Sequence, residues 1–136
     1  MDEQSTEPIV EPSLPGPVAR TVQIVFPNQA NHYGTLFGGE ALRLMDEAAF
    51  IAASRWARQT LVTVSSERVD FRAPIHAGEL VETVARVVKV GRTSVTVEIE
   101  LYGEDILSGD RRLATRGHFV FVAVDANGRP TAVVRR

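Results

Sequence analysis

The sequence lacks several features that would each point to a class of function. It contains no cysteine, which excludes disulfide bonds, thiolate metal sites and cysteine nucleophiles. No apolar run approaches the roughly 20 residues that a membrane-spanning helix needs. The net charge of −2 provides no positive field that would gather nucleic acid. We therefore expect a globular protein with neither a nucleic acid nor a membrane as its partner.

Sequence motifs of several enzyme classes are also missing. There is no G-x-S-x-G, no glycine-rich loop ending in G-K-[ST] and no G-x-G-x-x-G. This argues against a serine hydrolase of the α/β type, a P-loop enzyme and a dinucleotide-binding domain. The three histidines, His32, His76 and His118, are isolated and lack the H-E-x-x-H spacing, so we expect no metal site.

The composition divides the chain into a tail and one domain. Residues 1–19 hold four of the seven prolines, and such a segment buries too little apolar surface to offset the entropy of ordering. We predict a disordered tail over residues 1–19 and a single domain over residues 20–136, long enough for one sizeable core. The N-terminus has no basic segment followed by an apolar one, so we expect no secretory signal and a cytoplasmic location.

One acidic residue lies on an apolar face of a predicted helix. The pattern is helical from about residue 40 to residue 58, with more than one apolar face, which predicts an enclosed helix. The members of one stripe, at spacings of four, three and four, are Leu42, Asp46, Ala49 and Ala53. Its neighbour Glu47 falls on a polar stripe and is expected at the surface. Because burying a carboxylate is costly, Asp46 needs either a hydrogen-bonding partner or a chemical role.

The rest of the chain is typical of β-structure. Alternating apolar and polar residues predict strands over about residues 20–26, 61–71, 80–90, 93–101 and 113–125. The alternation is cleanest over residues 93–101, which predicts a sheet with one face toward water. In the first strand, Val22, Ile24 and Phe26 share a face that we expect to be half-buried. The short connections between the last four strands favour an antiparallel meander over parallel crossovers. The prediction is an α+β fold in which one sheet wraps one helix.

Several motifs occur together in an order typical of one family. They are P-N-Q-A-N-H-Y-G-T-L-F-G-G-E-A-L-R-L-M-D-E-A-A, V-T-V-S-S-E-R-V-D-F-R-A-P-I-H-A-G-E, G-R-T-S-V and F-V-F-V-A-V-D-A-N-G-R-P. With these motifs the chain, from about residue 20 to residue 131, resembles the hotdog-fold acyl-CoA thioesterases of the cytosolic acyl-CoA hydrolase group. The resemblance implies a five-stranded antiparallel sheet wrapped around one long central helix. It also implies hydrolysis of an acyl-CoA thioester to a free acid and coenzyme A.

The same resemblance implies the site and the assembly. The family's catalytic aspartate matches Asp46 and its loop asparagine matches Asn31, contributed by opposite subunits of a homodimer. Dimers of the family usually group further, here to a tetramer or hexamer. Coenzyme A is part of the substrate, and no separate cofactor is expected. Many members have aspartate where Asn28 stands here, so any loop contact that depends on that charge is absent.

Chemistry suggests roles for the residues around this pair. Asp46 acts either as a general base on water or as a nucleophile, and Asn31 orients the water or the carbonyl. Gly38 and Gly39 stand where the helix begins, and their backbone N–H groups suit a carbonyl oxygen. Further candidates are hydroxyls near the site and cations for the phosphates of coenzyme A. They are Thr63, Ser65, Arg92, Arg111, Arg112 and Arg116. Thr63 and Ser65 lie two positions apart, so we expect them to share one face of their strand.

Each candidate also has a purely structural alternative. Asp46 could bond a loop N–H, Asn31 could form an Asx-turn, and the glycines could only start the helix. The hydroxyls could be ordinary strand residues and the arginines solvated strand ends. At the level of the whole chain, the alternatives are a non-catalytic acyl-CoA-binding hotdog protein and an enoyl-CoA hydratase.

Overall fold

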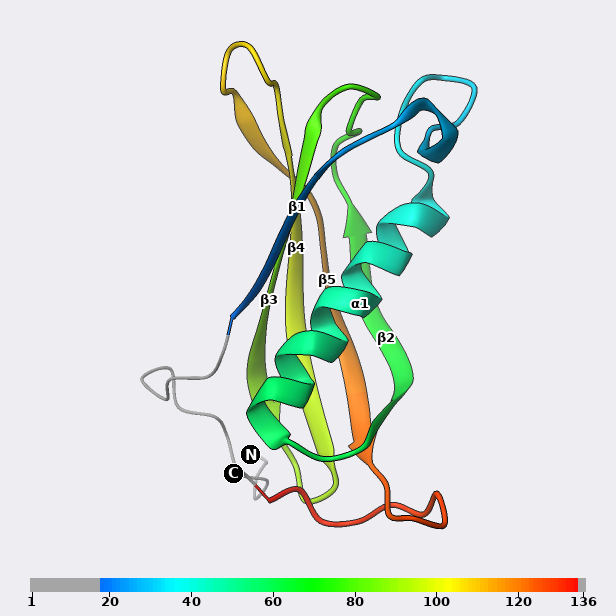
Figure 1. Cartoon of the computed structure of the whole chain (residues 1–136), viewed down its shortest axis with the longest axis vertical. Coiled ribbons are helices and arrows are strands. Elements are labelled where there is room, and N and C mark those ends of the chain that lie inside the picture. The colour runs from blue at the N-terminus through cyan, green and yellow to red at the C-terminus, as the bar shows by residue number, and fades with distance from the viewer. Residues whose placement is uncertain (1–17, 135–136) are drawn as a thin grey trace.

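The computed structural model describes residues 18–134 as one sheet with one long helix across its face (Figure 1). The elements are β1 (Ala19–Ile24), a short 3-10 helix (Pro27–Gln29), α1 (Gly38–Ala57), β2 (Leu61–Phe71), β3 (Leu80–Val90), β4 (Ser94–Glu104) and β5 (Arg111–Ala123). The predicted order of one strand, a helix and four strands is confirmed. The predicted tail lies outside the described residues except for its last two, of which Ala19 opens β1.

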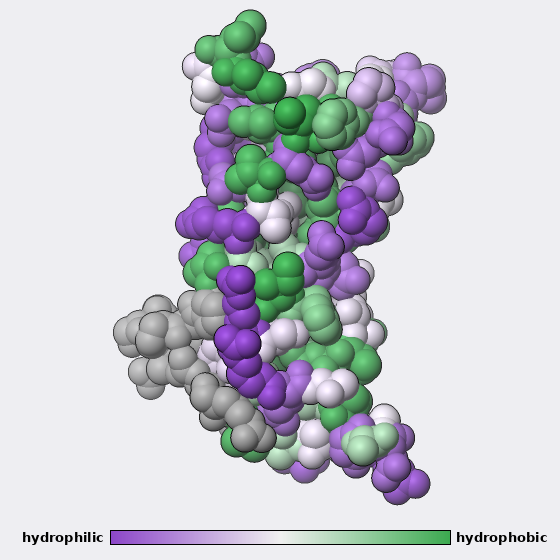
Figure 2. All heavy atoms as spheres, in the orientation of Figure 1, coloured by the Kyte–Doolittle hydropathy of each residue, from purple (hydrophilic) through white to green (hydrophobic). Residues whose placement is uncertain are grey.

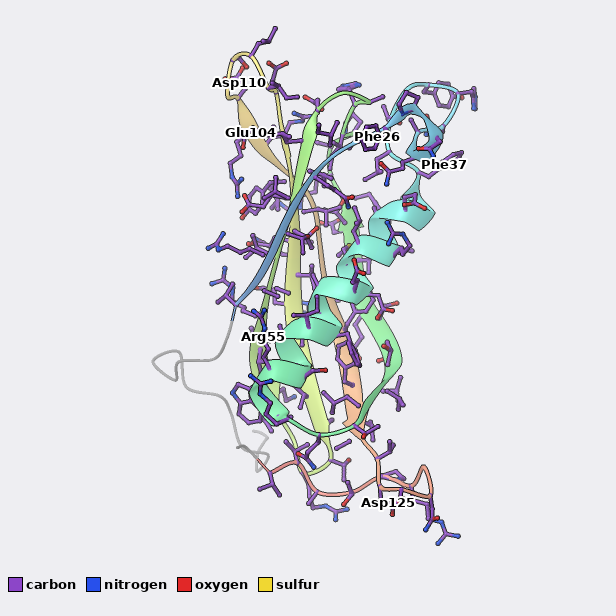
Figure 3. The ribbon with its side chains drawn as sticks, in the orientation of Figure 1. Phe26, Phe37, Arg55, Glu104, Asp110 and Asp125 are labelled. Atoms are coloured by element: carbon purple, nitrogen blue, oxygen red, sulfur yellow. The ribbon has the colours of Figure 1, made fainter. Side chains whose placement is uncertain are left out.

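The sheet is antiparallel throughout, in the order β1-β3-β4-β5-β2. Short connections make hairpins of β3 with β4 and of β4 with β5, as the meander prediction requires. The prediction is wrong for β2, which pairs with β5 at the edge of the sheet and not with β3. The strands before and after α1 occupy the two edges of the sheet, so the helix carries the chain from one edge to the other (Figure 1). Phe37 and Arg55 mark the two ends of this helix in Figure 3.

The buried face of α1 consists mostly of alanine. Met45 is fully buried, together with four alanines between residues 48 and 53. These small side chains let the helix backbone approach the sheet closely, against larger residues such as Ile99, Leu101 and Phe121. The helix packs mainly on β3 and β4 and makes few contacts with β2. The core therefore lies under the middle of the sheet, and one flank of the helix stays open.

The prediction that α1 is enclosed on more than one face is wrong for a single chain. Leu42 is 36% exposed and Phe50 45% exposed, because β2 does not close over the helix. Two apolar residues of β2, Val64 and Phe71, are exposed as well. Figure 2, which views the helix side, shows hydrophobic side chains at the surface among polar ones. The open flank between α1 and β2 thus carries apolar surface.

β1 forms the predicted strand, but the face of it that we expected to be half-buried is largely exposed. Val22 and Ile24 do share a face, but they are 58% and 41% exposed, and Phe26 after the strand is also exposed. The register pairs Val22 with Glu82, which belongs to the sheet face away from the helix. The side that faces the helix begins instead with the buried Ala19.

The sheet has one buried face and one polar face, as the alternation in β4 predicts. Buried and half-buried residues alternate along all eleven positions of β4. The outer face carries charged rows across the strands, including Arg116 paired with Glu100, and His118 placed 3.6 Å from Glu98. Burial would raise the pKa of Glu100, but hydrogen bonds from Arg116 and Tyr102 outweigh it and lower that pKa. The long helix is too polar to cross a membrane, and no other described helix is long enough to do so.

Candidate functional site

Asp46 lies on the open flank of α1 and points toward β2. Its carboxylate is half-buried, and its Oδ1 accepts a hydrogen bond from the Thr63 hydroxyl at 3.0 Å. Glu47, the next residue, is exposed, as the polar stripe predicts. The helical period thus separates one acid that faces the sheet from one that faces water.

A groove between α1 and β2 contains this pair. Arg43 comes from the helix, Ser65 and Ser66 come from β2, and Phe119 of β5 lies beneath them. The groove exists because the helix packs on β3 and β4 and leaves the inner side of β2 uncovered. The polar groups that line the groove are one carboxylate, three hydroxyls and one guanidinium, and the remaining lining residues are apolar.

The expectation that Thr63 and Ser65 share a face of their strand is wrong. A bulge between them shifts the register, so Thr63 pairs with the buried Phe121 and Ser65 with the half-buried Val120. Those adjacent partners face opposite sides of the sheet, and Thr63 and Ser65 do the same. Thr63 faces the helix and reaches Asp46. Ser65 still borders the groove, but it is not the second hydroxyl on the Asp46 side.

Asn31 organises the loop that precedes α1. Its Oδ1 accepts hydrogen bonds from the Tyr33 N–H at 2.9 Å, the Thr35 N–H at 3.2 Å and the Thr35 hydroxyl at 3.2 Å. This is the Asx-turn alternative, realised in the structure. Among the described residues, its Nδ2 group makes no observed hydrogen bond and is left as a donor. Asn31 can therefore hold its loop with the oxygen and donate with the nitrogen.

Gly38 and Gly39 form the first turn of α1, two residues earlier than the predicted start. Both are exposed, and a side chain added at either would meet nothing within 4 Å. Intrahelical bonding begins at Ala41, whose N–H reaches the Phe37 carbonyl at 2.9 Å. The N–H groups of the two glycines thus have no carbonyl partner within the helix, and they lie at its positive end.

The two halves of the expected site are far apart within one chain. Asp46 lies seven and eight residues after the glycines, which is roughly 10–12 Å along a helix axis at about 1.5 Å per residue. Hydrolysis needs the base and the oxyanion donors within about 3 Å of one reacting group. Within a single chain, Asp46 lies beside Thr63, and Asn31 lies in the loop before Gly38. The acid and the N–H donors therefore do not meet at one reacting group.

Three of the four arginines expected to bind phosphate already have carboxylate partners. Arg111 pairs with Glu82 and stacks on Tyr102, with the guanidinium carbon 4.0 Å from the ring centre. Arg116 pairs with Glu100 at 2.6 Å. The exposed Arg92 lies in the turn between β3 and β4.

Arg112 has the most complete set of partners. It pairs with Glu79 at 2.6 Å and donates to the Pro74 carbonyl at 2.7 Å. Hydrogen bonding with Glu79 raises the pKa of Arg112, and the same interaction lowers the pKa of Glu79. This arginine connects β5 to the segment between β2 and β3.

Two polar residues of the groove, Arg43 and Ser66, were missed by the sequence analysis. Arg43 stands three positions before Asp46, a spacing that places both on one side of a helix. Ser66 reaches the inner side of β2 only because of the bulge after Thr63, and an alternation rule cannot foresee a bulge. Within residues 18–134, no three His, Asp or Glu side chains gather as a metal site would require.

Comparison with known proteins places the chain beside acyl-CoA thioester hydrolases. The family model of the thioesterase superfamily matches residues 33–109. YkhA of Bacillus subtilis, an uncharacterized acyl-CoA thioester hydrolase, is 39% identical over 82% of this chain. The match spans 64% of that protein's length. YciA of Escherichia coli, an acyl-CoA thioester hydrolase, is 36% identical over 81% of this chain and 86% of its own.

Solved structures show the same similarity to acyl-CoA hydrolases and thioesterases. An acyl-CoA hydrolase from Bacillus cereus superposes with a TM-score of 0.84 at 36% identity, covering 87% of this chain and 72% of its own. A hexameric acyl-CoA thioesterase gives 0.83 at 35% identity, covering 87% and 76%. An acyl-CoA hydrolase from Staphylococcus aureus, solved with butyryl coenzyme A and coenzyme A, gives 0.82 at 34% identity, covering 87% and 72%.

Proposed function

This chain belongs to the thioesterase superfamily, and we propose that it hydrolyses acyl-CoA thioesters at a site shared between two copies of the chain. The family and the hotdog fold implied by the sequence motifs are thereby confirmed. The observation that carries the shared site is the separation of Asp46 from Gly38 and Gly39 within one chain. A second copy that covers the open flank of α1 supplies the missing half.

The proposed role of each residue follows from the chemical groups that it can contribute to the reaction. One protomer contributes Asp46, held by Thr63 through a 3.0 Å hydrogen bond. Its partner contributes the free Nδ2 group of Asn31 and the N–H groups of Gly38 and Gly39. The carboxylate is the proton acceptor or nucleophile, and the three donors receive the carbonyl oxygen.

Both possible routes of hydrolysis can be written with these residues, the substrate and water alone. In the general-base route, Asp46 takes a proton from water while the water oxygen attacks the thioester carbonyl carbon. The oxyanion formed is held by the Asn31 and glycine N–H donors, and its collapse breaks the C–S bond. The thiolate of coenzyme A then takes the proton back from Asp46. In the nucleophilic route Asp46 attacks directly, and water hydrolyses the resulting anhydride. In a single turnover in heavy-oxygen water, label in Asp46 together with an unlabelled acid product demonstrates the anhydride route, because only water attack on the Asp46 carbonyl of the anhydride gives that distribution.

Substituted relatives support these residue roles. The Staphylococcus aureus acyl-CoA hydrolase has been solved with an aspartate, a threonine or an asparagine replaced by alanine. The separations among those three positions equal the separations among Asp46, Thr63 and Asn31 in this chain. The same three residue types, at the same spacing, were thus chosen for substitution in a hydrolase that shares this fold.

The proposed assembly is a homodimer that associates further. The apolar residues left open between α1 and β2 need a cover, and an isologous contact lets each copy cover the other. Two solved relatives are described as hexameric, one of them with broad specificity. We extend this to a hexamer of three dimers. The cytoplasmic location expected from the sequence stays a prediction.

Coenzyme A needs cations near the mouth of the groove. Arg43 borders the groove beside Asp46, and we place it first among the candidates. Arg92 remains a candidate for binding phosphate only because its side chain is exposed. Arg43 itself pairs with Glu40 at 3.2 Å, so a glutamate partner alone does not decide the ranking. Arg111, Arg112 and Arg116 pair with glutamates and do not border the groove, so we rank them lower.

A thiol-release assay on purified protein tests the function. Wild type should liberate coenzyme A from acyl-CoA, and Asp46→Ala should lower kcat by about 10²–10⁴-fold, the span for a positioned general base. Glu47→Ala, which removes the exposed neighbouring acid, is the matched control and should keep wild-type turnover. Binding without thiol release would instead support the non-catalytic alternative, and undiminished turnover in Asp46→Ala would contradict the mechanism.

A further inference from the structure

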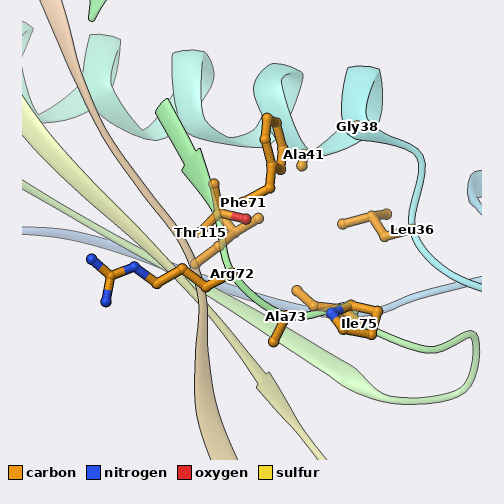
Figure 4. A pocket seen from close by; sticks show the side chains of 10 residues that line it. Leu36, Gly38, Ala41, Phe71, Arg72, Ala73, Ile75 and Thr115 are labelled. Carbon is orange, nitrogen blue, oxygen red and sulfur yellow. The ribbon is translucent and has the colours of Figure 1, made fainter. Parts of the chain in front are cut away.

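A second cavity lies in the open flank, beyond the Asp46 groove. It sits between the first turn of α1 and the end of β2, with a volume of about 290 Å³ (Figure 4). Gly38 and Ala41 line it from the helix, Phe71 from β2, and Leu36 and Ile75 from the adjoining loops. No step of the proposed hydrolysis uses this space.

The lining of the cavity is apolar. Among its described residues only Arg72 and Thr115 have polar side chains. The Arg72 guanidinium bonds Asp70 at 3.0 Å, and Figure 4 shows its side chain directed away from Leu36 and Ala41. Leu101 and Thr115 of the sheet, both buried, line the cavity from the core side. A cavity whose walls are mostly apolar suits a hydrocarbon better than a charged group.

Gly38 connects this cavity to the proposed reaction site. Its N–H belongs to the pair of donors proposed for the carbonyl oxygen, and the same residue lines the cavity. A thioester carbonyl held at the start of α1 therefore has its α-carbon at the cavity mouth. We propose that this cavity holds the acyl chain and limits the preferred substrates to chains of up to about twelve carbons, a limit set by Ala41 and Phe71. This inference rests on the proposed function.

The size limit comes from the volume. An engineered apolar cavity of about 150 Å³ holds benzene, with its six carbons. A cavity of about 290 Å³ is close to twice that size and has room for about twelve carbons. Each methylene that enters should improve affinity about fourfold, which corresponds to about 0.8 kcal/mol of apolar burial. Longer chains extend past the cavity and gain no further burial in it.

Two residues control this length in opposite directions. Ala41 is 4% exposed and contributes a single methyl group to the wall, so leucine there would take up the space of three carbons. Phe71 is 55% exposed and closes the cavity on the β2 side, so truncation would open that wall without emptying the core. Because Phe71 is exposed, Phe71→Ala should fold even if Ala41→Leu proves too crowded.

The experiment measures kcat/KM for acyl-CoAs from two to eighteen carbons, with dissociation constants for the matching non-hydrolysable S-alkyl-CoA thioethers. Wild type should gain about fourfold per methylene and level off near twelve carbons. Ala41→Leu should move the plateau about three carbons shorter, and Phe71→Ala should remove it. Ala126→Leu, in the exposed turn after β5, is the matched control and should leave the profile unchanged.

The outcomes for the cavity and for the function can be told apart. If thioesters are hydrolysed but neither cavity variant moves the plateau, the acyl assignment is overturned and the proposed function stands. If no acyl-CoA is hydrolysed, the proposed function fails, and the thioether constants alone decide the cavity. A length-dependent affinity that shifts with Ala41→Leu or Phe71→Ala supports the assignment, and a flat series overturns it.

Discussion

The hydrogen bond from Thr63 to Asp46 shows how one residue can set the chemistry of another. It occupies Oδ1 of the carboxylate at 3.0 Å and leaves Oδ2 for a water molecule or the thioester. A carboxylate held in this way loses less rotational freedom when the reaction begins. Thr63 is therefore a positioning residue, because it acts through Asp46.

Replacing Thr63 tests that role. Thr63→Val removes the donor, and losing a hydrogen bond to a charged group should lower kcat by about 10- to 100-fold. Thr63→Ser keeps the hydroxyl and should recover most of the activity. The measurement is kcat and KM for both variants. A Val variant that loses only substrate affinity, or a Ser variant as slow as Val, would show that the hydroxyl does not position Asp46.

The ion pair of Glu79 and Arg112 links stability to pH. Hydrogen bonding from Arg112 holds the pKa of Glu79 below its ordinary value of 4.5. Because the folded pKa is lowered, the stabilisation is complete above about pH 4.5 and is lost as the pH falls through the folded pKa. Acid should therefore weaken the link between β5 and the segment after β2.

Glu79→Gln measures this contribution. At pH 7 the variant should be less stable by about 1.5–3 kcal/mol, the range for a hydrogen bond between charged groups in a part-buried setting. Below pH 4.5 the difference from wild type should shrink. Urea unfolding across pH 3–8 provides the data, with Glu47→Gln as an exposed control. A difference that stays constant with pH would mean that the charge of Glu79 does not contribute.

At the scale of elements, the contact between α1 and the sheet depends on small residues. A Cβ added to Gly117 of β5 would lie 3.0 Å from Val69 Cγ2 and 3.1 Å from Met45 Cε. The helix, β5 and the bulged part of β2 meet at this point. Glycine favours this close approach, since an added methyl group would require Val69 and Met45 to shift by a few tenths of an ångström.

Gly117→Ala should lower the free energy of unfolding by about 1–3 kcal/mol, the usual cost of overpacking a core. Gly38→Ala is the stability control, because its added methyl would meet nothing within 4 Å. There alanine should leave stability unchanged or raise it by up to about 1 kcal/mol through helix propensity. Denaturation midpoints decide between these outcomes. Equal stability of Gly117→Ala and wild type would contradict the packing argument.

At the scale of the whole molecule, the chain carries exposed apolar surface, which in our proposal a second copy covers. Leu42 and Phe50 on α1, with Val64 on β2, flank the groove that contains Asp46. The donors at Asn31 and Gly38 lie at the end of the same flank. A two-fold contact over this flank would bring the donors of each copy toward the acid of the other.

Mixing two inactive variants tests the shared site. Asp46→Ala protomers retain Asn31, and Asn31→Ala protomers retain Asp46. After co-expression, about a quarter of wild-type activity should return, since half of randomly paired dimers are mixed and each has one intact site. Native mass spectrometry confirms that mixed dimers form. Mixed dimers without activity would place both residues of each site in the same chain.

Periodicity was enough to identify much of this protein. The spacing of residues 40–58 predicted the helix and separated Asp46 from Glu47, and the alternation in residues 93–101 predicted a sheet with one wet face. Both rest on fixed geometric repeats of the backbone, so a single sequence suffices. The motifs added the family, which the comparisons confirm.

Tertiary structure determined features that the periodicity of the sequence does not encode. A bulge turned Ser65 away from Thr63, and the position of the helix over β3 and β4 left the α1 flank open. The register of β1 put Val22 on the outer face, where hydrophobicity alone had suggested burial. These outcomes depend on strand register and on how elements pack, which are set by contacts between residues distant in the sequence. The sequence by itself determined which chemical groups the protein carries and on which repeat they fall. The helical rise by itself separates Asp46 from the start of α1 by roughly 10–12 Å, at about 1.5 Å per residue. Only packing decided that the flank of α1 between them stays open, where a partner can reach both ends.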